Sequence, residues 1–154
     1  MKKISDHISY KEATFSKTAN ALGIKNKPKA EHIKNMEKVA EKVFEPLREW
    51  VGCPIKVNSF YRSEQLNSAI KGSAVSSHLK GQAIDITSMA CEKDDCKSNL
   101  DMFHYIRKNL DFDQLIWEFG SEPKWLHVSY VSKKANRNQV LVTKRRGKYF
   151  TYAD

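Results

Sequence analysis

The hydrophobic residues of this 154-residue chain are spaced as in a helix early in the chain and alternate as in strands mostly later. In the segment 30–50 they recur every three or four residues, which places them on one face of a helix. These residues are Ile33, Met36, Val39, Val43, Leu47 and Trp50. Pro46 lies inside this segment and should kink or split the helix, because proline lacks the amide hydrogen and collides with the preceding turn.

The remaining elements follow from alternation, capping residues and turns. Expected strands are 55–60, 83–87, 114–119, 125–131, 139–143 and 149–152. Ser63 and Ser98 are suited to begin helices. The strands 114–119 and 125–131 flank a turn and should form a hairpin, while the last two segments should add edge strands. Helices that mostly precede antiparallel strands predict an α+β fold.

Length and composition place limits on the class of protein. A chain of 154 residues without repeats or a long linker predicts one domain, 1–154. No stretch reaches the roughly 20 apolar residues that a membrane span needs, so we expect no membrane insertion. Lys2 and Lys3 are not followed by an apolar run, which argues against a secretory signal and for synthesis in the cytoplasm.

The formal net charge of +9 predicts an anionic partner, either nucleic acid or an anionic cell-wall polymer. Much of the excess lies near the C-terminus, at Lys133, Lys134, Arg137, Lys144, Arg145, Arg146 and Lys148. A simple solvated basic face is the alternative. Of the three cysteines, Cys91 and Cys96 could pair in an oxidising compartment or remain free thiols.

The segment 76–85, SSHLKGQAID, places a histidine in a loop and a carboxylate in the strand that follows. Gly81 lies between His78 and Asp85 and allows a sharp turn, so the histidine can face the carboxylate. Asp85 alternates with two isoleucines and faces a cleft if they form the core. Taken alone, the pair is also compatible with a surface histidine and a surface aspartate.

The expected hairpin contributes two further groups. His127 shares a strand face with Trp125 and Ser129, and Glu118 lies on the partner strand. Neighbouring strands lie about 5 Å apart, so an imidazole and a carboxylate can converge on one point. Two imidazoles and one carboxylate form a zinc site with an open fourth position. A further carboxylate can act as general base, so the pattern predicts a catalytic centre with one Zn²⁺ per chain.

The combined pattern S-x-H-x-x-G-x-A-x-D, an acidic residue and W-x-H resembles the zinc D-alanyl-D-alanine carboxypeptidase family. That family includes phage L-alanyl-D-glutamate endopeptidases and shares its fold with the hedgehog signalling domain. The segment 59–63, SFYRS, looks like the family's arginine-bearing segment, and Glu12, Phe15, Ser16 and Ala19 look like the start of phage and bacterial members. The resemblance implies a hedgehog/DD-peptidase-like fold, with helices packed on an antiparallel sheet.

The resemblance also implies roles for individual residues. His78, Asp85 and His127 match the zinc ligands. Glu118 matches the catalytic base, and Arg62 matches the residue that stabilises the oxyanion or holds a substrate carboxylate. A further match is Ser76, which corresponds to a serine that helps to anchor the substrate.

The position of the base departs from part of the family. Several members carry it three residues before the last histidine, where this chain has Lys124. The base is therefore expected at Glu118, as in branches with a longer hairpin, and Glu122 in the turn is the alternative. We expect Trp125 to line the substrate cleft, whereas Trp117 either lines the cleft or, as we favour, belongs to the core.

The motifs together predict a zinc metallopeptidase that hydrolyses D-amino-acid-containing stem or cross-link peptides of bacterial peptidoglycan. Carboxypeptidase and endopeptidase activities need the same groups, so the bond that is cut stays open. The lack of a signal peptide and the compact size favour a phage lysis enzyme that acts at the cell wall. A host-encoded wall enzyme exported by another route is the alternative.

Two other interpretations compete with the enzyme. One is a catalytically inactive, zinc-containing module that binds the cell wall; Glu118 argues against it, because a purely structural zinc site needs no free carboxylate. The other is a nucleic-acid-binding protein, which leaves the His-Asp-Glu-His set unexplained. We therefore expect peptidoglycan peptides, and not nucleic acid, as the partner, and a monomer as the working state.

Overall fold

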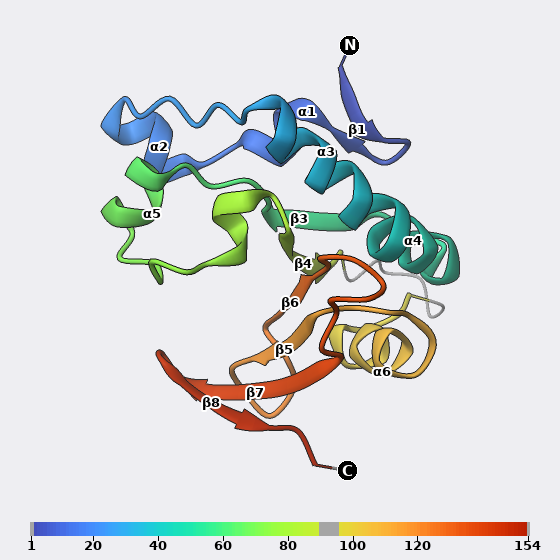
Figure 1. The fold of residues 1–154 in the computed structure, drawn as a ribbon. Coiled ribbons are helices and arrows are strands. Elements are labelled where there is room, and N and C mark those ends of the chain that lie inside the picture. The colour runs from blue at the N-terminus through green and yellow to red at the C-terminus, as the bar shows by residue number, and fades with distance from the viewer. Residues whose placement is uncertain (1, 90–95, 154) are drawn as a thin grey trace.

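The computed structural model describes residues 2–89 and 96–153, which form helices packed against a six-stranded sheet (Figure 1). The helices are α1 (Tyr10–Thr14), α2 (Lys17–Leu22), α3 (Ala30–Val39), the π-helix η1 (Ala40–Phe44), α4 (Glu45–Val51), α5 (Glu64–Ala69), the 3₁₀-helix η2 (Ser77–Lys80) and α6 (Asn99–Asn109). The strands are β1 (Lys3–Ser5), β2 (Ile8–Ser9), β3 (Ile55–Ser59), β4 (Ala83–Ser88), β5 (Gln114–Glu118), β6 (Trp125–Ser129), β7 (Gln139–Arg145) and β8 (Lys148–Thr151). This architecture confirms the predicted α+β fold class.

The long helix expected early in the chain is divided around Pro46. Helix α3 passes into the π-helix η1, where the amide of Glu45 donates to the carbonyl of Ala40. Helix α4 then begins with Pro46 in its first turn, where the missing amide hydrogen costs no intrahelical bond. The split leaves Val39 and Leu47 fully buried, and it confirms the expected effect of the proline.

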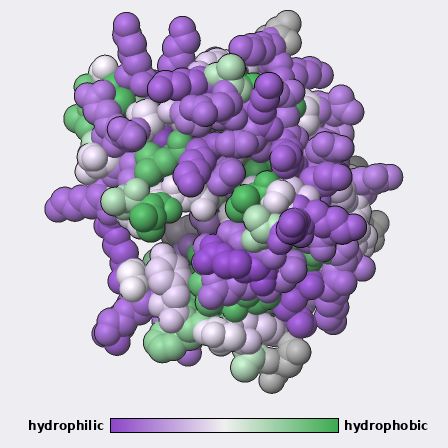
Figure 2. Space-filling model, in the orientation of Figure 1, coloured by the Kyte–Doolittle hydropathy of each residue, from purple (hydrophilic) through white to green (hydrophobic). Residues whose placement is uncertain are grey.

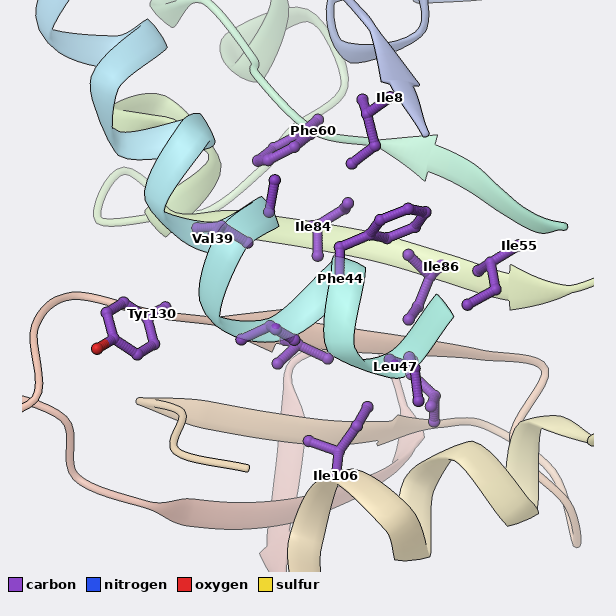
Figure 3. Packing of buried hydrophobic residues seen from close by; sticks show 14 of the residues in the cluster. Ile8, Val39, Phe44, Leu47, Ile55, Phe60, Ile84, Ile86, Ile106 and Tyr130 are labelled. Atoms are coloured by element: carbon purple, nitrogen blue, oxygen red, sulfur yellow. The ribbon is translucent and has the colours of Figure 1, made fainter. Parts of the chain in front are cut away.

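The hydrophobic core lies between the main sheet and the layer of α3, η1, α4 and α6. Ile84 and Ile86 of β4 project toward Phe44 of η1 and Leu47 of α4, and Ile106 of α6 belongs to the same cluster (Figure 3). Each of these five side chains is almost inaccessible to solvent, and full burial of such a side chain typically contributes about 1.5–3 kcal/mol. Because the two isoleucines are fixed on the core side, Asp85 between them must point to the other face of the sheet.

The main sheet has the order β3-β4-β6-β5-β7-β8. The expected hairpin of β5 and β6 is confirmed. The expectation that both C-terminal segments are edge strands is wrong for β7, which pairs in parallel with β5 on one side and with β8 on the other. Since β6 already occupies one side of β5, the chain crosses to the free side after β6, and its reversal makes β7 parallel to β5. Only β8 ends the sheet.

Two expectations concern features outside the sheet. None of the helices in the described ranges combines the length and the apolar character that a membrane crossing requires. Cys91, for which the sequence leaves open both pairing with Cys96 and a free thiol, lies outside the described residues.

The crossover between β6 and β7 is anchored by a buried carboxylate. Asp113 accepts hydrogen bonds from the backbone amide of Arg137 at 3.0 Å and from its side-chain Nε and Nη2 at 2.9 and 2.8 Å. These bonds hold the pKa of Asp113 below its usual value, although burial opposes the effect. Such charge-assisted bidentate pairs are among the stronger hydrogen bonds in proteins.

Replacement of this carboxylate, Asp113→Asn, should lower the free energy of unfolding at pH 7 by about 1–3 kcal/mol. Because the pKa of Asp113 is lowered in the folded state, its contribution is present above the unfolded-state pKa of about 4 and is lost as the pH falls below that value. Urea unfolding at pH 7 and pH 3 should therefore show a difference from wild type that shrinks in acid. The exposed neighbour Asp111→Asn is the control, and a difference that grows in acid would contradict this account.

Candidate metal centre

The sheet face opposite the core carries a row of reactive side chains. Asp85 on β4 lies directly opposite His127 on β6, and Glu118 at the end of β5 lies opposite Trp125. Residues that are directly paired across neighbouring strands share a sheet face. The alternation that buries the isoleucines of β4 therefore brings an aspartate and a histidine together on the solvent side, as the sequence predicts.

His78 reaches this face from the turn before β4. Its Nδ1 lies 2.7 Å from the carbonyl of Phe60 and donates to it, so the lone pair of Nε2 is free to bind a cation. Gly81 ends η2 with a φ of 72°, and a Cβ there would lie only 2.6 Å from the carbonyl of His32. This glycine thus permits both the turn and the close approach to α3 that return His78 to the sheet.

The three side chains converge on one point. Asp85 Oδ1 lies 3.2 Å from His78 Nε2 and 3.0 Å from His127 Nδ1, and the potential ligand atoms of the three residues all lie within 4.8 Å of one another. Burial alone would raise the pKa of Asp85, but the neighbouring imidazoles, His78 first, hold it well below its usual range. The carboxylate is therefore ionised and ready to act as a ligand.

The donor set fits a zinc ion. Nε2 of His78 is buried and forms no hydrogen bond within the described chain, an unusual state for a buried polar atom. A cation bound by His78, Asp85 and His127 would satisfy it. Two imidazole nitrogens and one carboxylate oxygen, with access from a cleft, are the ligand types of a catalytic zinc site.

Glu118 lies in the same cleft but outside this ligand group. Its side chain is buried at the end of β5. Burial raises the pKa of Glu118 to about 7; His127 opposes the rise and the charge of Asp85 adds to it. A carboxyl group that titrates near neutral pH can both accept and donate a proton.

The cleft around these groups has a volume of about 800 Å³ and is also lined by Arg62, Ser76 and Trp125. The Nη1 of Arg62 donates to Asn67 Oδ1 at 2.9 Å, and its backbone amide donates to the carbonyl of His78 at 3.1 Å. Burial lowers the pKa of Arg62 and Asp85 raises it, and a guanidinium stays protonated in proteins. Ser76 Oγ accepts from the amide of His78 at 3.3 Å.

The other candidate positions for the catalytic base, and the second candidate tryptophan, lie outside the cleft that contains Glu118. Glu122 and Lys124 are exposed in the turn between β5 and β6, and neither lines the cleft. Trp117 packs edge-on against Phe103 with ring centroids 5.3 Å apart, on the core side of the sheet. The favoured assignment of Trp117 to the core is thus confirmed.

Several cleft residues were not anticipated from the sequence. Thr143 of β7 and Tyr149 of β8 lie in the cleft wall beyond Glu118, and Arg146 lies in the turn between the two strands. Their strands were recognised from β-forming residues, but the parallel pairing of β7 with β5 was not. Nothing in the sequence around Asn67, apart from its place in a short helix, indicates that it accepts a hydrogen bond from Arg62.

Two imidazoles, a carboxylate and a separate buried carboxylate in one cleft are the groups of a metal-dependent hydrolase. The description Peptidase M15 belongs to a family model that matches residues 6–129, a span that contains all of these groups. No curated protein matches the chain. The chain belongs to the Peptidase M15 family, whose members are zinc-dependent peptidases.

Metal-free protein should bind one Zn²⁺ per chain, and Asp85→Asn or His127→Ala should weaken the binding at least about ten-fold. Loss of a residue that hydrogen-bonds to a metal ligand typically lowers the metal affinity by roughly 10–100-fold, and loss of a ligand itself should lower it at least as much. Isothermal titration calorimetry measures the stoichiometry and the affinity. His104→Ala on α6 is the control, and unchanged affinity in both ligand variants would exclude this site.

In zinc-free protein, Glu118→Gln should raise the free energy of unfolding at pH 8. The pKa of Glu118 is raised to about 7 in the folded state. Its contribution to the free energy of unfolding is therefore fully present below the ordinary pKa of about 4.5 and is lost as the pH rises through 7, where the buried carboxyl group ionises. We expect a gain of about 1–2 kcal/mol, less than the full shift, because solvent in the cleft screens the charge. Urea unfolding in the presence of a chelator at pH 5 and pH 8 measures the change in the free energy of unfolding. The exposed Glu122→Gln is the control. A gain found only at pH 5 would contradict the prediction.

Proposed function

We propose that the protein is a zinc peptidase that hydrolyses D-amino-acid-containing stem or cross-link peptides of bacterial peptidoglycan. The observation that carries the proposal is the common cleft of the ligand group His78, Asp85 and His127 with the separate carboxylate of Glu118. Family membership supports peptide hydrolysis. The substrate class is supported by the resemblance of both histidine motifs to D-alanyl-D-alanine carboxypeptidases.

Glu118 would move the protons of the reaction. Bound Zn²⁺ would polarise the scissile carbonyl and lower the pKa of a water to about 7. A carboxylate oxygen of Glu118 accepts the proton of the attacking water and later donates it to the leaving amine. The raised pKa of Glu118 favours this second step, because the protonated form is then accessible near neutral pH.

Arg62 would balance the negative charge of the substrate. Its guanidinium lines the cleft and could stabilise the developing oxyanion or bind a substrate carboxylate. Loss of one oxyanion donor typically costs about 2.7–4 kcal/mol of barrier. We assign Ser76 and the ring of Trp125 to anchoring the peptide, since both line the same cleft.

The charge of the protein supports an anionic substrate. The formal net charge is +9, and hydrophilic side chains cover most of the face in Figure 2. Such a surface attracts carboxylate-rich stem peptides and anionic wall polymers. We propose the cell wall as the place of action and phage lysis as the role, and mass spectrometry of digested muropeptides would identify the bond that is cut.

Glu118→Gln should reduce the release of peptides from purified peptidoglycan by about 10²–10⁴-fold, because the general base and acid is lost. Zinc binding should persist, since Glu118 is not a ligand. Mass spectrometry of the soluble products measures the rate, and Glu122→Gln should retain wild-type activity. Undiminished cleavage by Glu118→Gln would refute the assignment. Zinc-loaded wild type that binds peptidoglycan but cleaves no peptide would instead favour the inactive binding module.

A further inference from the structure

The hairpin of β7 and β8 follows residue 129, where the match to the family ends, yet it forms one wall of the cleft. Thr143 of β7 is paired with Glu118 on one side and with Tyr149 of β8 on the other. The three residues therefore share the sheet face of the metal ligands. All three line the cleft, so a substrate in the cleft can reach this hairpin.

Arg146, in the turn of this hairpin, connects the hairpin to the opposite wall. Its Nη2 donates to the carbonyl of Ile70 at 2.9 Å and to that of Lys71 at 3.1 Å. Both carbonyls lie in the loop that follows α5. The contact crosses one end of the cleft and fixes the guanidinium there, because a donor shared by two carbonyls has little freedom to move.

The loop that receives Arg146 is itself held in place. Nδ2 of the buried Asn67 donates to the carbonyl of Ser73 at 2.9 Å, and the amide of Gly72 donates to the carbonyl of Asn67 at 2.8 Å. A Cβ on Gly72 would lie only 2.1 Å from Asn67 Oδ1, the atom that accepts from Arg62. Asn67 of α5 thus holds both Arg62 and the loop that receives Arg146.

Three basic residues, Arg62, Lys71 and Arg146, line the cleft. Across the described residues, the hydrogen bonds of the Arg146 side chain all use Nη2, which leaves Nε and Nη1 for a ligand. Either nitrogen can donate a single charge-assisted hydrogen bond to a carboxylate oxygen.

We infer that Arg146 is a specificity-determining residue that binds a carboxylate of the substrate peptide. The inference rests on the proposed function and extends it, because it assigns a carboxylate of the peptide to the end of the cleft where Arg146 contacts the loop after α5. A purely structural strap would affect every ligand of the cleft alike, whereas a carboxylate-binding residue discriminates between an acidic peptide and its neutral amide.

The test uses the zinc-loaded full chain with Glu118→Gln as parent, so that a bound peptide is not cleaved. The probes are a synthetic stem pentapeptide with free carboxylates and the same peptide with every carboxylate amidated. Calorimetry should show that the parent binds the acidic peptide about ten-fold or more tightly than the amide. Adding Arg146→Gln should remove most of this preference by weakening the binding of the acidic peptide alone. The control, Lys148→Gln at the exposed start of β8, should leave the preference unchanged.

Other outcomes separate this inference from the proposed function. The inference would be overturned if Arg146→Gln weakened the binding of both peptides equally. It would also be overturned if the preference for the acidic peptide survived this substitution or was absent in the parent. If wild type cleaves the peptides while the preference is independent of Arg146, the proposed function stands and the inference fails. If the preference depends on Arg146 but wild type cleaves neither peptide, the inference stands and the proposed function fails.

Discussion

The site depends on the pairing of Asp85 with His127 across the neighbouring strands β4 and β6. A carboxylate on the wall of a packed sheet is costly unless it is paired, and two imidazoles supply that pairing. The carbonyl of Phe60 orients the third ligand, His78. Its Nε2 therefore points to the place where the paired Asp85 and His127 can bind a cation.

The hydrophobic core sets this arrangement. Ile84 and Ile86 are fully buried against the helical layer, and side chains alternate strictly along a strand. A slip of β4 by one residue would turn Asp85 into the core and an isoleucine into the cleft. The large apolar area beneath the sheet therefore determines the positions of the polar groups above it. Glu118 follows the same rule on β5, and its burial beside the ligands is also the reason for its raised pKa.

The sequence contained enough to predict the order of most elements and the face of the central strands. Alternation around Asp85, the hairpin of β5 and β6, and Pro46 in the long helix are all local signals, and each led to the observed structure. The parallel pairing of β7 with β5 depends on which side of the sheet is free, a property of the assembled fold. Contacts such as that of Arg146 with Ile70 join residues 76 positions apart and leave no periodic signal. The distal wall of the cleft was therefore not predictable.

Anomalous diffraction at the zinc absorption edge, from crystals grown with zinc, tests the central claim most directly. The account predicts one strong peak per chain, in contact with Nε2 of His78, the carboxylate of Asp85 and the His127 ring. A zinc peak elsewhere, with His127 still hydrogen-bonded to Asp85 and no ion between the three side chains, would contradict it.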